Sequence, residues 1–182
     1  MPRILLLFSA VMVLGLSACS GSSEEGGGGT VDSDEALHGL MQAIALDFAQ
    51  VLADVAPQYS AAAQKQNGST ECPEGGGAAW AESGFGGGTL TLDSCRMNGI
   101  AVTGTLSGYV EAGPTDVNGT MLSGPVTASG GYSASLNVTN LLISAQLPID
   151  VELTYWEITA MTEGGKDLCA WSGGSGCAPS PF

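Results

Sequence analysis

The chain has 182 residues, with 18 acidic against 4 basic side chains and a formal net charge of −14. This length predicts one domain or at most two small ones, and an apolar share of 44% is enough to build a core. Because phosphate binding depends on Lys and Arg, so acidic a chain is expected neither to bind nucleic acid nor to be attracted to an anionic membrane surface.

Residues 1–18 are predicted to be a signal peptide. Arg3 supplies the positive start, and the stretch 4–16 is almost wholly apolar but too short to span a bilayer. The following residues, Leu16-Ser17-Ala18-Cys19, resemble the lipobox of bacterial lipoproteins, in which the Cys is lipidated and becomes the mature N-terminus. The alternative is an ordinary secretory signal with Cys19 after it by chance.

The lipobox resemblance implies a location in the bacterial cell envelope. Acyl chains such as palmitate on Cys19 would anchor the protein, so that the polypeptide needs no membrane-binding surface of its own. Ser20, the residue after the Cys, resembles the one found in lipoproteins of the outer membrane. The protein would then face either the periplasm or the outside of the cell. Removing residues 1–18 leaves 3 basic against 18 acidic side chains, a net charge of −15. Residues 19–31 are predicted to be a Gly/Ser-rich tether, and residues 32–182 a single domain.

The domain is expected to open with its one long helix. Asp32, Ser33 or Asp34 can cap the start, and Pro57 marks the end. Apolar residues recur at spacings of three and four over five turns, which predicts an amphipathic helix with a single buried stripe. The stripe comprises Leu37, Leu40, Met41, Ile44, Phe48, Val51, Leu52 and Val55.

After about residue 78 the apolar period changes to two. Apolar and polar residues alternate around 90–92 and over 100–111, 132–139 and 147–155, and turn signals such as Asn98-Gly99 and Gly130-Gly131 separate the runs. The apolar phase shifts at Asn140-Leu141 and at Tyr155-Trp156, which indicates β-bulges or strand bends. The expected fold class is α+β: the helix packed on a curved antiparallel β-meander of about six strands.

Three glycines fall on the apolar faces of the predicted strands: Gly104, Gly108 and Gly124. Glycine there leaves room for a close approach, or lets the sheet bend sharply. The helix is the expected occupant of that space, and an apolar ligand is the alternative. A helix on a curved sheet is similar in layout to the half-barrels of bacterial lipoprotein carriers, but no motif is shared and no residue is carried over.

Four cysteines remain after Cys19, and an even number in an exported chain predicts two disulfides. Of the three possible connectivities, the sequence-local one is favoured, Cys72–Cys95 with Cys169–Cys177. The spacing does not suit a metal site, because the sequence has no Cys-x-x-Cys pair and its single histidine, His38, lies on the helix. Neither a metal nor a cofactor is expected.

The sequence shows no catalytic constellation. His38 is expected at the surface or boundary of the helix, and no Gly-x-Ser-x-Gly elbow is present. Asp150 and Glu152 are expected to be solvated on the wet face of a strand. Trp171, inside the small Cys169–Cys177 loop, is the candidate for partner contact, although it could instead cover a sheet edge.

These observations favour a non-enzymatic envelope module, structural or partner-binding, that reaches the membrane through its lipid anchor at Cys19. A carrier or sensor that holds an apolar small molecule between the helix and the curved sheet is the alternative. In that case the ligand would face Gly104, Gly108 and Gly124.

Overall fold

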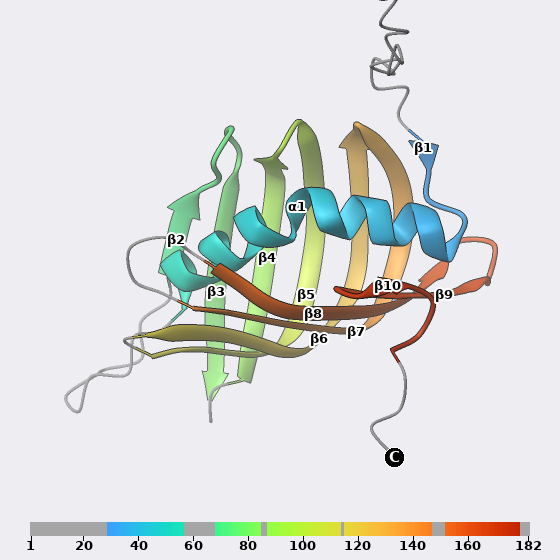
Figure 1. Ribbon diagram of the computed structural model, residues 1–182. Helices are drawn as coiled ribbons and strands as arrows, with labels where there is room; N and C mark the ends of the chain where they lie inside the picture. The colour runs from blue at the N-terminus through green and yellow to red at the C-terminus, as the bar shows by residue number, and fades with distance from the viewer. Residues whose placement is uncertain (1–28, 57–67, 85–86, 114, 147–151, 179–182) are drawn as a thin grey trace, which may run out of the picture.

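The computed structural model describes residues 29–56, 68–84, 87–113, 115–146 and 152–178. These residues form one helix on one face of a large antiparallel sheet (Figure 1). The α+β class is therefore confirmed in this coarse form. The predicted signal peptide, Cys19 and the first part of the predicted tether lie outside the described residues.

Helix α1 runs over Asp34–Val55. Of the three predicted caps the middle one is used, because Ser33 Oγ accepts a hydrogen bond from Ala36 N at 3.2 Å. The helix ends with Ala56 as its C-cap, directly before Pro57. All eight residues of the predicted stripe are buried. By length and composition α1 could cross a membrane, but here its apolar side packs on the sheet.

The strands lie side by side in sequence order, with every neighbouring pair antiparallel. The order across the sheet is β2 (Gly68–Glu71), β3 (Gly77–Gly84), β4 (Gly87–Met97), β5 (Ile100–Ala112), β6 (Asp116–Gly130), β7 (Tyr132–Gln146), β8 (Glu152–Thr162), β9 (Asp167–Trp171) and β10 (Gly174–Ser175). The prediction of about six strands is too low. The additional strands are short or rich in Gly and Ala, which hides the alternation that marks a strand.

A further short strand marks the start of the folded part. β1 (Gly29–Thr30) pairs in parallel with the first residues of β7. Val31 is 3% exposed, and its N–H donates to Ser133 O at 3.0 Å. The described fold therefore begins at Gly29 and not at Asp32, so the predicted tether overlaps the fold in its last three residues.

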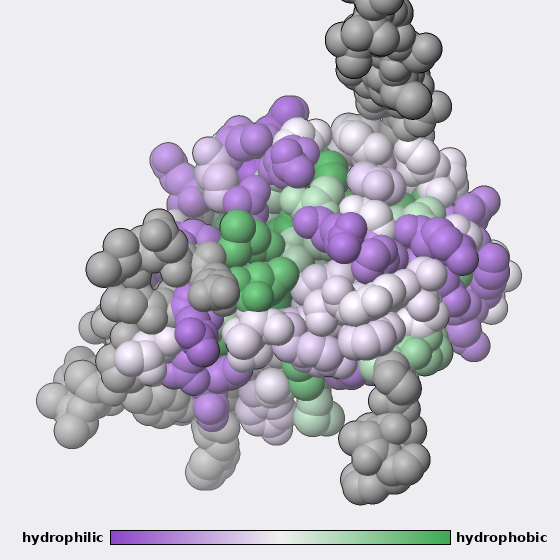
Figure 2. All heavy atoms as spheres, in the orientation of Figure 1, coloured by the Kyte–Doolittle hydropathy of each residue, from purple (hydrophilic) through white to green (hydrophobic). Residues whose placement is uncertain are grey.

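Helix α1 lies across one face of the sheet, here called the inner face, and contacts every strand from β2 to β10. Side-chain hydrogen bonds hold it on the sheet: for example, Cys169 N donates to Asp34 Oδ1 at 2.9 Å, and Asn98 Nδ2 donates to Ala43 O at 3.2 Å. On the side that carries α1, the surface is mostly hydrophilic or neutral, with the largest hydrophobic area left of centre and smaller ones elsewhere (Figure 2). The opposite side of the sheet is called the outer face.

Two register shifts in the β7–β8 pairing confirm the predicted phase breaks. One lies between Val138 and Asn140, and the other between Ser144 and Ala145, opposite the step from Tyr155 to Leu153. Each places an extra residue in one strand, as a β-bulge does. The second shift turns Tyr155 to the outer face, whereas the next residue, Trp156, is buried.

Candidate functional site on the outer face

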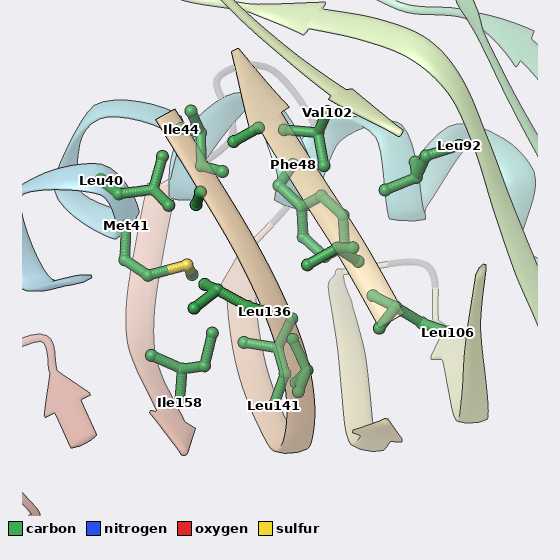
Figure 3. Close-up of a pocket in the computed structure, with 14 residues that line it drawn as sticks. Leu40, Met41, Ile44, Phe48, Leu92, Val102, Leu106, Leu136, Leu141 and Ile158 are labelled. Atoms are coloured by element: carbon green, nitrogen blue, oxygen red, sulfur yellow. The ribbon is translucent and has the colours of Figure 1, made fainter. Parts of the chain in front are cut away.

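The inner face holds a small cavity of about 40 Å³ under the helix. Its lining is entirely apolar, and the side chains of Leu40, Met41, Ile44 and Phe48 point from α1 toward those of the strands (Figure 3). Pockets that bind small molecules typically measure about 300–1,000 Å³. The helix therefore fills most of the space that a ligand would need.

The three glycines predicted to face a ligand lie elsewhere: Gly104, Gly108 and Gly124 are not among the residues that line the cavity. A Cβ on any of them would collide with a backbone carbonyl of the neighbouring strand, at Pro125, Met121 and Thr105 respectively. The β5–β6 pairing also shifts register in this region. The space predicted for a ligand is occupied at these positions by strand backbone, and the glycines allow the two strands to approach closely.

Trp171 ends β9 and is half-buried on the outer face. Its six-membered ring lies directly against Gly173, because a Cβ added there would collide with the ring. Ser172 N donates to Trp156 O at 2.9 Å, so the pairing with β8 continues one step past Trp171. The ring thus folds onto its own loop near the sheet edge and keeps part of its surface exposed.

A carboxylate lies directly across from this ring. Glu157 in β8 is the cross-strand partner of Trp171, and side chains in such pairs have Cβ atoms about 4.5–5.5 Å apart on the same face. Tyr155 Oη donates a hydrogen bond to Glu157 Oε2 at 2.9 Å. Tyr155, Glu157 and Trp171 are called the outer cluster below.

The charge state of the outer cluster follows from its contacts. Burial first, and then the hydrogen bond and charge of Glu157, raise the pKa of Tyr155 above its ordinary value. The hydroxyl therefore keeps its proton at neutral pH and orients the carboxylate. The two basic residues in the described part of the chain lie apart from it: Arg96 in β4 and Lys166 in the β8–β9 turn, whose Nζ donates to Asp32 O at 2.6 Å.

Both predicted disulfides are present. Cys72–Cys95 joins the segment after β2 to β4, and Cys169–Cys177 closes a loop with a sequence separation of 8 around Trp171. The sequence-local connectivity is therefore confirmed. Within the described ranges no group of three or more His, Cys, Asp or Glu residues could hold a metal ion.

His38 packs against the buried Trp156, with ring centroids 5.5 Å apart. Its Nε2 is buried and finds no hydrogen-bond partner among the described residues. The residue sits at the boundary of the helix, as expected. Asp150 lies outside the described residues, and of Glu152 only the backbone is described.

An acidic pair lies at the rim of the inner face. Burial first, and then the nearby charge of Glu74, raise the pKa of Asp47 on α1, while a hydrogen bond with the backbone of Asn98 lowers it. Glu74 Oε2 is itself held by a hydrogen bond from Gly99 N at 2.6 Å. These contacts join the helix to the loop after Cys72 and to the β4–β5 turn.

No family model, curated protein or solved structure matches this chain. The site therefore rests on its geometry. The sequence singled out Trp171 but missed Tyr155 and Glu157, because β9 was not predicted and its register with β8 decides which side chains meet. The sequence feature that could have revealed Tyr155 is the phase shift at Tyr155-Trp156, because this shift turns Tyr155 to the outer face.

Proposed function

We propose that this protein is a lipid-anchored, non-enzymatic module of the bacterial envelope that binds a partner at the outer cluster. The observation that carries the proposal is the half-buried Trp171, held on a disulfide-closed loop beside Glu157 while α1 fills the inner face. A rigid aromatic residue beside a charge is a common anchor in protein interfaces. His38, packed on Trp156, supports a non-enzymatic role.

The envelope location rests on two features of the chain. The lipobox Leu16-Ser17-Ala18-Cys19 supplies an anchor, and Ser20 favours the outer membrane. The two disulfides fit an oxidising compartment, where such bonds persist. From Cys19 to Gly29 the tether can reach at most about 35 Å, so the domain would stay close to the membrane that anchors it.

We further infer that the sheet is curved around the helix, in a layout similar to the half-barrels of lipoprotein carriers. The contacts of α1 with both ends of the sheet support this curvature, as does the changing direction of the strands in Figure 1. The carrier alternative is less well supported. An apolar cavity of about 40 Å³ is too small for a lipid chain.

Replacing the predicted lipid attachment site tests the anchor. Cys19→Ser should release the protein from the membrane fraction and abolish incorporation of radiolabelled palmitate, because no acyl chain can then be attached. Ser22→Ala, in the same segment, is the matched control and should leave both unchanged. Membrane fractionation of Cys19→Ser identical to that of the wild type would contradict the anchor.

Site-specific photo-crosslinking in intact cells tests partner binding. A photoreactive residue at Ser172, beside Trp171, should give a discrete crosslinked product, and the product should weaken with Trp171→Ala. The control position is Thr103 on β5, which is exposed on the same sheet. No product at 172, or the same product at both positions, would argue against a partner at the outer cluster.

A further inference from the structure

We propose that the outer cluster of Tyr155, Glu157 and Trp171 is a binding site for a guanidinium group, presented by an arginine in a basic segment of a protein partner. This inference rests on the proposed partner-binding function and names the chemistry of the partner. Its basis is the placement of an aromatic ring and an oriented carboxylate on neighbouring strands.

The ring of Trp171 provides the stacking surface. It lies against Gly173, which has no side chain to displace it, and as a half-buried residue it keeps part of its surface exposed. A planar guanidinium stacks on the face of an indole through cation–π attraction. The Cys169–Cys177 disulfide closes the loop, so little conformational entropy is lost when a partner binds.

The carboxylate of Glu157 lies within reach of a group stacked on that ring, because the two residues are directly opposite each other. Tyr155 Oη occupies one position on Oε2 at 2.9 Å. A carboxylate has about four acceptor positions, so the other oxygen is available for the forked N–H groups of arginine. The hydroxyl therefore orients the carboxylate without saturating it.

Charge decides which class of ligand fits best. Among the described residues no basic side chain pairs with Glu157, and the chain carries a net charge of −14. Such a field attracts cationic partners and raises their rate of encounter. Arginine is favoured over lysine because only its planar fork can stack on Trp171 and pair with Glu157 at once. An anion would be repelled, and a neutral sugar would use the ring but not the charge.

The test is an NMR titration of the purified full chain in detergent, following the Trp171 indole N–H resonance. The probe is N-acetyl-arginine amide, and N-acetyl-citrulline amide is its neutral analogue of the same shape. Arginine should give a saturable shift that salt weakens and citrulline does not reproduce. Glu157→Gln should weaken arginine binding about fivefold, as expected when a partly exposed ion pair is lost and the stacking on Trp171 remains.

A second aromatic–carboxylate pair offers a matched control. Tyr109 and Glu111 lie two residues apart on β5, and both are exposed. Glu111→Gln removes the same charge from the same sheet and should leave the arginine response at Trp171 unchanged. The resonances of the buried Trp80 and Trp156 report whether each variant keeps its fold.

Three outcomes would overturn the inference. These are an equal response to citrulline, a response to chitotriose, added as a neutral sugar probe, but not to arginine, and no response to any of the three probes. A crosslink at Ser172 without an arginine response would leave the proposed partner binding in place and would refute only the proposal that the site binds a guanidinium group. Loss of both signals would refute the proposed function as well.

Discussion

The two faces of the sheet are built from the same alternating strands but differ in what they meet. The inner face carries the apolar side chains and is covered by α1, leaving a cavity of about 40 Å³. The outer face carries mainly hydroxyl groups, such as those of Thr139 and Thr159, 2.8 Å apart. It also carries large exposed side chains, with Tyr109 at 44% and Met121 at 65% exposure.

This difference is the reason for placing the proposed partner site on the outer face. A face already filled by its own helix has little room for another molecule, so its apolar residues serve stability. The outer face has no covering element among the described residues, and there an aromatic ring or a charge is available to a partner. The outer cluster gathers both on β8 and β9.

The largest expected effect comes from opening the inner face. Phe48 is 4% exposed and lines the cavity, so Phe48→Ala should lower the free energy of unfolding by about 3–5 kcal/mol through lost burial and an enlarged void. Tyr109→Ala on the outer face should cost less than about 1 kcal/mol. Urea denaturation followed by tryptophan fluorescence measures both. Similar losses would mean that the two faces are equally covered.

A smaller effect is expected where the strands approach each other. Gly124 has φ 147°, and a Cβ there would collide with Thr105 O. Gly124→Ala should therefore cost about 1–3 kcal/mol, measured by the same denaturation. Gly29→Ala is the control, since nothing lies within 4 Å of its added Cβ. If Gly124→Ala left the free energy of unfolding unchanged, there would be free space at this position, and the apolar-ligand alternative would be open again.

Local patterns predicted the covered face well. The helix stripe is visible because its period of 3.6 is contained within one segment, and Leu37 in the first turn and Leu52 near the end are both fully buried. The edge strand β2 has no apolar residue in Gly68–Glu71, so no pattern could reveal it. What lies opposite Gly104 depends on the register between β5 and β6, which the sequence of one strand does not contain.

The candidate site was predictable only in part for the same reason. Trp171 is recognisable because it lies between two cysteines close in sequence. Its meeting with Glu157 depends on the pairing of β8 with β9, and the outward turn of Tyr155 depends on a bulge in the β7–β8 pairing. To predict which residues meet on a sheet, the register between its strands must therefore be known. The buried stripe of a helix can be predicted without it.

The smallest expected effect lies at the rim between the two faces, at Asp47. Burial and the nearby Glu74 raise the pKa of its carboxyl, so the folded protein holds the proton more tightly than the unfolded chain does. The resulting stabilisation is complete below the ordinary pKa of 3.8 and is lost as the pH rises through the raised value. At neutral pH the ionised carboxylate therefore lowers the stability of the fold.

Asp47→Asn should accordingly be neutral at low pH and should stabilise the protein at neutral pH by up to about 0.5 kcal/mol, since the amide can still accept the Asn98 hydrogen bond. Denaturant midpoints measured across this pH range give the comparison. Glu111→Gln removes one charge from an exposed position on β5 and controls for the high net charge. If both variants gained the same stability, the effect would come from overall charge repulsion. Only a gain confined to the Asp47 variant would place the effect at the rim, where the helix meets the acidic loop.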